Sequence, residues 1–231
     1  MTSEHFQDDA PATLDRDAYL ARIGYTGTLE PTLETLRALH CARASSIPFE
    51  NIDIVLGRAI SLNLDDLQKK LVRAGRGGYC FEQNTLFAAA LESLGFQVTT
   101  LAARVRFGAI EICPRLHMML EIQIDGDPWL ADVGFGSAGP LYPIMLYETE
   151  ADQQGFWRFR VRTEDDQFVL ESHECDGRVE DLYAFTRERQ YPVDYEVGNH
   201  YTSTLRTRGS SACLSLRRAP SRHAGPCITM N

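Results

Sequence analysis

The sequence predicts an α+β protein in which the helices come first and the strands follow. In residues 13–95, leucines recur at helical spacing between residues that commonly begin and end helices. From residue 96 onward, β-branched and other apolar residues alternate with polar ones instead. The composition, 44% hydrophobic and 24% charged, is ordinary for a globular protein. We therefore expect residues 13–95 to be mostly helical and residues 96–201 to be mostly β-structure.

The first three expected helices each have a recognisable beginning or end. Asp15 can cap the first helix and Asn63 the third, because short polar side chains accept hydrogen bonds from the free N–H groups of the first turn. Pro31 suits the first turn of the second helix, and Gly75 can end the third. The inward faces of the second and third helices are marked by leucines: Leu33, Leu36, Leu39, Leu64, Leu67 and Leu71.

The fourth helix is expected to begin at a cysteine. Gly77 and Gly78 precede Cys80 and allow a sharp turn and the close approach of a ligand. The apolar residues that follow have helical spacing, and Gly95 is a natural terminator. A cysteine at a helix N-terminus experiences the positive end of the helix dipole, which favours the nucleophilic thiolate. Cys80 is therefore either a catalytic nucleophile or a buried thiol that packs ahead of a core helix.

Strict alternation identifies the clearest strand. The apolar residues Leu116, Met118, Leu120, Ile122 and Ile124 occupy every second position. The segment 125–128, with sequence DGDP, is a turn signal. Further β-like runs lie at 98–101, 157–161 and 168–171. These runs predict a largely antiparallel second half.

His117 and Asp132 complete a possible catalytic set with Cys80. A cysteine nucleophile needs a histidine that takes the thiol proton and a carboxylate that orients the imidazole and stabilises its charged form. The alternation places His117 on the face opposite the apolar row. A plain hairpin closed at the DGDP turn pairs Asp132 with Glu121, about 13 Å from His117 at ~3.3 Å per residue. Hydrogen bonding needs about 3 Å, so we expect a bulge or a longer excursion to break the register.

Charge, termini and cysteine spacing argue against several classes of function. The net charge of −9 disfavours nucleic acid as the main partner. No segment has the roughly 20 apolar residues that span a bilayer, and the acidic, polar start at residues 1–11 does not resemble a signal peptide. The six cysteines include no C-x-x-C pair, so we expect no metal site. These features favour a cytoplasmic protein that acts on small molecules.

Several segments together resemble the arylamine N-acetyltransferase family. The resemblance covers roughly residues 15–203, and the run around Cys80 is its most specific part. One departure is Arg43, where the family usually has a histidine. The matching segments are YLARIGY (19–25), IPFENID (47–53), RGGYCFEQN (76–84), ARV (103–105), His117, DVGFG (132–136) and YPVDYE (191–196) with Asn199.

The resemblance implies a fold, a site and a reaction. It implies a helical bundle that carries Cys80 and a β-barrel domain that carries His117 and Asp132, arranged as in cysteine proteases. It also implies acetyl-CoA as co-substrate, and an arylamine or hydrazine as acceptor that receives the acetyl group from the cysteine in a ping-pong mechanism. No metal is implied. The residues expected to line the acceptor pocket are Phe49, Val105, Phe135 and Gly136.

The end of the chain departs from the family pattern. We expect residues 1–95 to form the helical domain, residues 96–201 the β-barrel domain, and residues 202–231 a basic tail in place of the family's third, α/β lid domain. The tail holds five arginines and no acidic or aromatic residue. Three interpretations are open: a disordered basic tail, a natural short ending, or the preferred one, a shift of reading frame that leaves activity in doubt.

Other functions and roles also stay open at this stage. The same Cys-His-Asp set would serve a thiol hydrolase or an amide synthase, and a form without a lid could bind ligands without turnover. His40, on a leucine-rich helix, is expected to be a satisfied core or surface histidine. Arg76 either pairs with a carboxylate to hold the loop before Cys80 or is solvated. Glu82 is expected to be structural, since an acidic residue in the first turn favours the helix.

Overall fold

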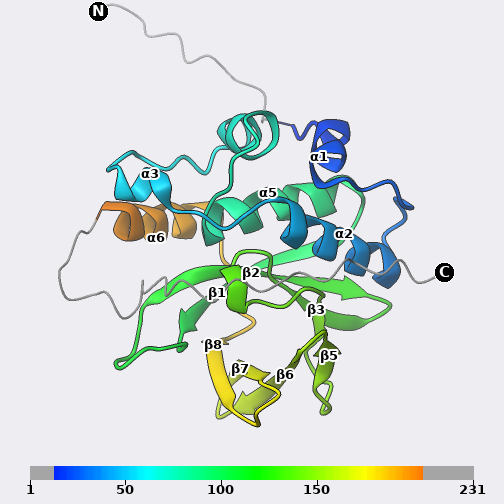
Figure 1. The fold of residues 1–231 in the computed structure, drawn as a ribbon, viewed down its shortest axis with the longest axis vertical. Helices are drawn as coiled ribbons and strands as arrows, with labels where there is room; N and C mark the ends of the chain where they lie inside the picture. The colour runs from blue at the N-terminus through cyan, green and yellow to red at the C-terminus, as the bar shows by residue number, and fades with distance from the viewer. Residues whose placement is uncertain (1–12, 205–231) are drawn as a thin grey trace, which may run out of the picture.

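The computed structural model describes residues 13–204 and confirms the α+β class. Helices gather on one side of a single eight-stranded sheet, and the far strands of the sheet curl away beneath them (Figure 1). The helical segments are α1 (Arg16–Ile23), α2 (Leu33–Ser46), α3 (Ile52–Val55), α4 (Leu64–Leu67), which continues as a π-helical segment η1 (Gln68–Arg73), α5 (Cys80–Ser93), a short 3₁₀ turn η2 (Gly136–Ala138) and α6 (Pro192–Thr204).

Most of the expected helix ends are found where capping chemistry places them. The Asp15 carboxylate accepts a hydrogen bond from the Ala18 N–H, and the Asn63 amide oxygen accepts one from the Asp65 N–H. The second helix begins two residues after Pro31, where Thr32 provides the cap. The third helical segment ends before Gly75 as predicted. These caps define the first turns of α1, α2 and α4, whereas α5 and α6 are the helices that pack directly on β2.

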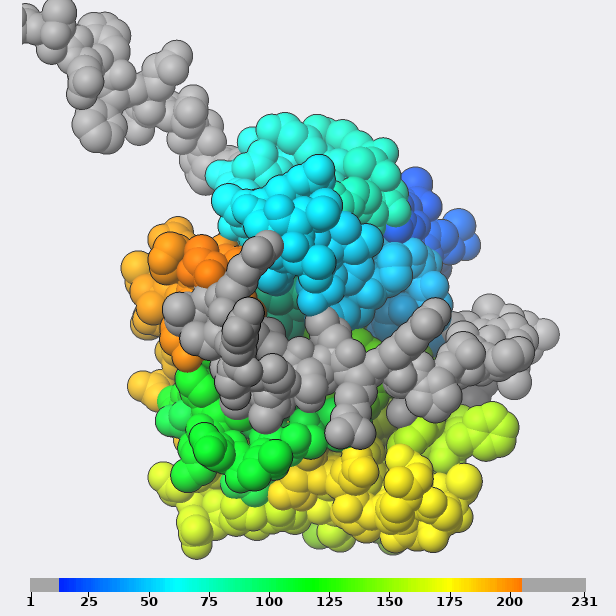
Figure 2. Space-filling model, turned by 60° about the vertical axis from the view of Figure 1, so that its left-hand side comes forward, coloured from blue at the N-terminus to red at the C-terminus, as the bar shows by residue number. Residues whose placement is uncertain are grey.

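The strands form an antiparallel, nearly closed barrel. Their order in the sheet is β4-β3-β2-β1-β8-β7-β6-β5, and β4 also contacts β6, so the sheet curls toward closure. Figure 2 shows the helices above and the strands below as two layers of one body. The strands are β1 (Gln97–Val105), β2 (Arg115–Ile124), β3 (Asp127–Ala131), β4 (Ile144–Met145), β5 (Asp152–Gln154), β6 (Trp157–Glu164), β7 (Gln167–His173) and β8 (Val179–Phe185).

Strand β2 separates two apolar cores. Its even-numbered apolar residues, from Met118 to Ile124, pack with the helices. On the opposite face, Met119 packs inside the barrel with residues of β1, β3, β6, β7 and β8. His117 shares this second face of the strand. Because both faces of β2 are covered, a side chain such as His117 can be fully enclosed.

The predicted register of the β2–β3 hairpin was wrong. The turn contains two residues, Asp125 and Gly126, with φ of 54° and 94°, rather than the four expected. Such paired positive φ values belong to the tight hairpin turns that Asp-Gly favours. Leu120 therefore pairs with Ala131, and the strand direction carries Asp132 toward the neighbourhood of His117 without a bulge between β2 and β3.

Two α-helices were not predicted, nor were the strands β4, β5 and β8 named individually. The four-residue α3 and the 13-residue α6 both lie outside the expected helices; in Figure 1, α3 lies above α6, and α6 packs on β2. Helix α6 begins with Pro192, a favoured first helical residue, and its Asp194 carboxylate accepts the Tyr191 N–H at 2.8 Å. It extends through residues 202–204, which had been assigned to the tail.

The remaining expectations about the tail, including the frame shift and the missing lid, concern residues 205–231 and lie outside the described residues. The division into domains at residues 95 and 201 stays a prediction.

Candidate active site

Cys80 is the first residue of α5, as predicted. Its side chain is 8% exposed, and its thiol lies 3.8 Å from the Leu116 carbonyl oxygen at the start of β2. The helix start is fixed by Glu82, whose carboxylate accepts a hydrogen bond from the Tyr79 N–H at 3.1 Å. The cysteine therefore stands at the positive end of a rigid helix dipole, close to the sheet.

A partly buried charge cluster holds the loop that precedes Cys80. Arg76 binds Glu50 at 2.7 Å and Asp53 at 2.9 Å, so the loop arginine is paired rather than solvated. Lys70 joins Asp53 to Glu82, with both contacts at 2.8 Å. Burial raises the pKa of Asp53, but the hydrogen bonds and charges of Lys70 and Arg76 outweigh it and lower this pKa to about 2. The cluster thus ties the nucleophile loop to the 47–53 segment and to α5.

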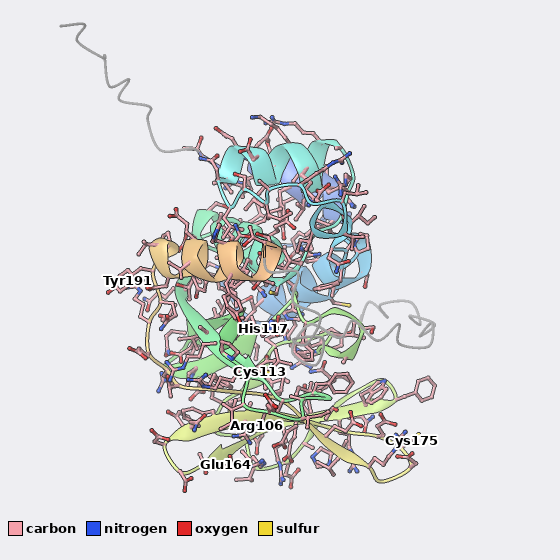
Figure 3. All side chains as sticks on the ribbon, turned by 90° about the vertical axis from the view of Figure 1, so that its left-hand side faces the viewer. Arg106, Cys113, His117, Glu164, Cys175 and Tyr191 are labelled. Atoms are coloured by element: carbon pink, nitrogen blue, oxygen red, sulfur yellow. The ribbon has the colours of Figure 1, made fainter. Side chains whose placement is uncertain are left out.

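His117 and Asp132 form a buried pair beside the cysteine. The His117 Nε2 atom lies 2.7 Å from Asp132 Oδ2, and both residues are at most 3% exposed. Figure 3 shows His117 between the helices and the lower strands of the barrel. Burial lowers the pKa of His117, but the Asp132 carboxylate and the hydrogen bond to Cys80 raise it to about 10. Because Nε2 faces Asp132, Nδ1 is the ring atom left for the Cys80 thiol.

The Asp132 carboxylate is held from several sides. Its Oδ1 atom accepts hydrogen bonds from the Asn84 side-chain amide at 3.0 Å and from the Gly134 N–H at 2.8 Å. Asn84 also donates to the Met118 carbonyl at 2.7 Å and accepts from the Val133 N–H at 3.1 Å. Burial raises the pKa of Asp132, whereas His117 and these donors lower it below its usual range. The carboxylate is therefore ionised and fixed in direction.

Gly134 lets this segment lie directly against the nucleophile helix. A Cβ atom at this position would stand 2.8 Å from the Cys80 Cα and 2.5 Å from the Asn84 amide nitrogen. Both distances are shorter than real Cβ contacts, so any larger residue would push the Asp132 segment away from α5.

Aromatic rings enclose His117. The ring centroids of Phe135 and Tyr183 each lie 5.0 Å from that of His117, and Phe107 packs edge-on against Phe135. Phe135 also contacts Tyr183 at 5.2 Å. The rings exclude water from one side of the imidazole and leave an apolar wall next to the ion pair.

The other residues predicted to line a pocket lie near this wall. Phe49 approaches Gly136, where an added Cβ would be 3.5 Å from the phenylalanine ring. Gly136 has φ of 76°, a conformation that favours glycine. Val105 pairs with Tyr183 across β1 and β8 and shares its face of the sheet. Phe49 and Gly136 thus lie against each other. Val105 is linked to the site only by its cross-strand neighbour Tyr183, which contacts His117.

The sequence analysis did not identify Asn84 or Tyr183 as part of this site. It also did not foresee the contact of His40 with Asp132. The His40 Nε2 atom accepts a hydrogen bond from the Asp132 backbone N–H at 3.1 Å. Asn84 follows Cys80 by four residues and so lies on the same side of α5, which is a signal that could have identified it. Tyr183 and His40 come from distant segments, and no local pattern links them to Cys80.

Two further properties concern residues 13–204. No group of three or more histidine, cysteine, aspartate or glutamate side chains there is placed to hold a metal ion. None of the helices in this range is long and apolar enough to cross a membrane.

Comparison with known proteins gives consistent matches along this chain. The sequence model of the N-acetyltransferase family matches residues 32–215. The arylamine N-acetyltransferase of Escherichia coli K12 is 37% identical over 186 residues, which are 80% of this chain and 66% of that protein. This chain thus spans just under two thirds of the length of that relative.

Solved structures agree with the sequence matches. The arylamine N-acetyltransferase of Nocardia farcinica superposes with a TM-score of 0.77 at 47% identity, covering 86% of this chain and 74% of that one. The enzyme of Mycobacterium marinum in complex with CoA superposes with a TM-score of 0.79 at 35% identity, covering 84% and 73%.

Proposed function

Because the chain belongs to the arylamine N-acetyltransferase family, we propose that it transfers an acetyl group from acetyl-CoA to an arylamine or hydrazine through an acetylated Cys80. The observation that carries this proposal is the enclosed set of Cys80, His117 and Asp132. His117 contacts the carboxylate on one side and the thiol on the other, so the proton of Cys80 can pass to the imidazole. The solved relative with bound CoA supports acetyl-CoA as the donor.

The first half-reaction loads the enzyme. The Cys80 thiolate attacks the thioester carbonyl of acetyl-CoA, and backbone N–H groups in the first turn of α5 stabilise the oxyanion. The carbon–sulfur bond to CoA then breaks, and the His117 imidazolium gives its proton to the departing CoA thiolate. The products are acetyl-Cys80, free CoA and a neutral His117. A thioester is exchanged for a thioester, so the step is close to balanced in free energy.

The second half-reaction transfers the acetyl group. The unprotonated amine attacks the acetyl-Cys80 carbonyl while the neutral His117 takes a proton from the amine nitrogen. The bond between the carbonyl carbon and the Cys80 sulfur breaks, which restores the thiolate and the imidazolium. Asp132 orients the imidazole throughout and stabilises it whenever it is charged. Phe49, Phe135, Gly136 and Val105 offer an apolar surface on which an aromatic ring can pack, which favours an arylamine as acceptor.

The proposed intermediate can be tested directly by mass spectrometry. Incubation with acetyl-CoA and no acceptor should acetylate Cys80, and addition of an arylamine such as p-aminobenzoic acid should remove the label as N-acetyl product. Cys80→Ser should carry no label and lose turnover, since a serine hydroxyl is not ionised near neutral pH.

Cys175→Ser is the matched control for this experiment. Cys175 is also a free cysteine but is exposed in the turn between β7 and β8, so the substitution should change nothing. Acetylation of Cys175 in place of Cys80 would reject the assignment. Acetyl-Cys80 that is released as acetate at the same rate with and without amine would instead favour a thiol hydrolase.

A further inference from the structure

His40 is a fully buried histidine outside the set of three proposed catalytic residues. It lies on α2, and its ring meets Phe87 of α5 edge-on with centroids 5.8 Å apart. Its two ring nitrogens contact two points of the chain segment that follows β3. Nε2 lies 3.1 Å from the Asp132 backbone nitrogen, and Nδ1 lies 2.9 Å from the Leu141 carbonyl oxygen.

These partners determine the protonation state of the ring. A backbone N–H can only donate, so Nε2 must be the unprotonated acceptor toward Asp132. A carbonyl can only accept, so Nδ1 must carry the proton toward Leu141. The ring is therefore neutral and in the Nδ1–H form. Protonation of Nε2 would place two N–H groups against each other.

The surroundings of His40 support the neutral form. Burial lowers its pKa to about 4, and the charge on Arg43 of the same helix acts in the same direction. The Leu141 carbonyl and the Asp132 carboxylate at the end of β3 act in the opposite direction and are outweighed. The charged groups that act on the ring are thus Arg43 on its own helix and Asp132 across from it.

The position of this contact matters for the proposed reaction. Strand β3 ends at Ala131, so the hydrogen bonds of the sheet no longer hold the backbone of Asp132. Its side chain must nevertheless stay in place on His117. The same imidazole also holds Leu141, so one ring ties together two points of the segment 132–141. That segment carries Phe135 and Gly136, which lie against His117 and Phe49. A shift of the Asp132 backbone would move both the carboxylate and the aromatic wall.

We propose that His40 is a positioning residue that holds the Asp132 carboxylate on His117, and that it does so as the neutral Nδ1–H tautomer. The proposal rests on the proposed function, because its consequence for turnover requires the His117–Asp132 pair to be catalytic. The geometry itself can be tested without turnover, since the reactivity of Cys80 reports whether His117 is still paired with Asp132.

The test compares substitutions that separate hydrogen bonding from packing. His40→Gln keeps an acceptor and a donor, whereas His40→Phe keeps a ring but loses both hydrogen bonds. Phe87→Leu is the matched control, because it removes the edge contact to His40 and touches neither hydrogen bond. Each variant is assayed for kcat and KM with acetyl-CoA and p-aminobenzoic acid, and for the rate of Cys80 alkylation by iodoacetamide between pH 5 and pH 9.

We expect His40→Phe to lower kcat at least about tenfold with little change in the KM for acetyl-CoA, since small misplacements of catalytic groups have large effects on rate. Its alkylation profile should shift to higher pH. His40→Gln and Phe87→Leu should stay within about threefold of the parent in kcat and keep its profile. A folded His40→Phe protein with the parental profile would overturn the proposal, as would an equal shift in Phe87→Leu.

A second pair of variants decides the matter if His40→Phe does not fold. His40→Asn carries the same amide as His40→Gln but is one methylene shorter, so it cannot reach both Asp132 and Leu141. An impaired His40→Asn beside a near-normal His40→Gln supports positioning by hydrogen bonds, and equal behaviour of the two overturns it. If the parent protein is not acetylated at Cys80, the proposed function fails, whereas the alkylation profiles still test the role of His40.

Discussion

Two buried histidines contact different atoms of Asp132, and only one of the two rings is charged at pH 7. His117 meets the carboxylate of Asp132, and its pKa is raised to about 10. His40 meets the backbone N–H of the same residue, and its pKa is lowered to about 4. Burial disfavours the charged form of both rings to begin with. The difference therefore comes from the atom that each ring meets.

The comparison shows how one aspartate can organise two different tasks. The carboxylate stabilises a charged imidazole that can exchange protons with Cys80, whereas the N–H group accommodates a neutral imidazole that serves as a structural acceptor. If the two rings exchanged their environments, a charged His40 would repel the Asp132 N–H, and a neutral His117 would no longer give Cys80 a cationic partner. The following predictions test this contrast, beginning with the largest expected effect.

Replacement of Asp132 by Asn should remove the difference in charge between His117 and His40. The backbone N–H that His40 binds remains, but His117 loses its carboxylate and should become as neutral as His40 at pH 7. Comparable substitutions in catalytic triads reduce kcat by about 10⁴ through the wrong tautomer. Steady-state acetyl transfer is the measurement, and a variant within tenfold of the parent would show that the carboxylate does not matter.

Replacement of each histidine by Gln should affect the thiol differently. In His117→Gln, the rate of iodoacetamide alkylation of Cys80 at pH 6 should fall at least about tenfold, because the thiolate loses its cationic partner. In His40→Gln the rate should be nearly unchanged. Equal loss of reactivity in both variants would mean that Cys80 responds to general disruption of the site rather than to His117.

The pH dependence of stability should also separate the two residues. The pKa of His40 falls from 6.5 in the unfolded chain to about 4 in the folded protein. Between these values the unfolded state binds a proton at this residue and the folded state does not. The contribution of His40 to the free energy of unfolding is therefore complete above pH 6.5 and is lost as the pH falls through about 4. This amounts to about 1.4 kcal/mol per pH unit within that window.

His117 has the opposite sign. Its pKa is raised, so its contribution to stability is complete below pH 6.5 and is lost as the pH rises through about 10. Urea unfolding of the parent and of His40→Gln from pH 7 to pH 4 tests the first of these statements. The free energy of unfolding should fall less steeply in the variant. Parallel curves would indicate that His40 is not held neutral.

The smallest effect is expected at Arg43. Its guanidinium is completely buried, and Nη1 donates to the Ile47 carbonyl at 3.1 Å. Within residues 13–204, Nε and Nη2 make no hydrogen bond of ordinary geometry, and the Tyr19 hydroxyl only partly opposes the lowering of the Arg43 pKa by burial. Arg43→Met should therefore leave the free energy of unfolding unchanged or raise it by about 1 kcal/mol.

The same substitution should slightly raise the pKa of His40, since Arg43 lowers it. Urea unfolding and a histidine NMR titration measure the two effects. A loss of more than about 1 kcal/mol in Arg43→Met would show that the buried guanidinium has a stabilising partner.

The sequence could predict those parts of the molecule that depend on local patterns. The start of α5 at Cys80, the caps at Asp15 and Asn63, and the strand around His117 follow from capping chemistry and periodicity. The hairpin register failed because a four-residue turn was assumed where Asp125 and Gly126 suffice. Asp-Gly between alternating strands is itself a signal for that shorter turn.

The support of the site could not be predicted in the same way. His40 lies 92 residues from Asp132 in sequence, and its role depends on how α2 packs beside the end of β3. Tyr183 reaches His117 because β8 pairs with β1, which no local pattern specifies. Both contacts arise only when the helices and the sheet are assembled.

Histidine NMR at pH 7 tests the central contrast most directly. In ¹⁵N-labelled protein, with signals assigned through the His40→Gln and His117→Gln variants, His117 should carry protons on both ring nitrogens. His40 should be neutral with its proton on Nδ1. A neutral His117 beside a charged His40, or two neutral rings, would contradict the assignment of Asp132 as the partner that keeps His117 charged for Cys80.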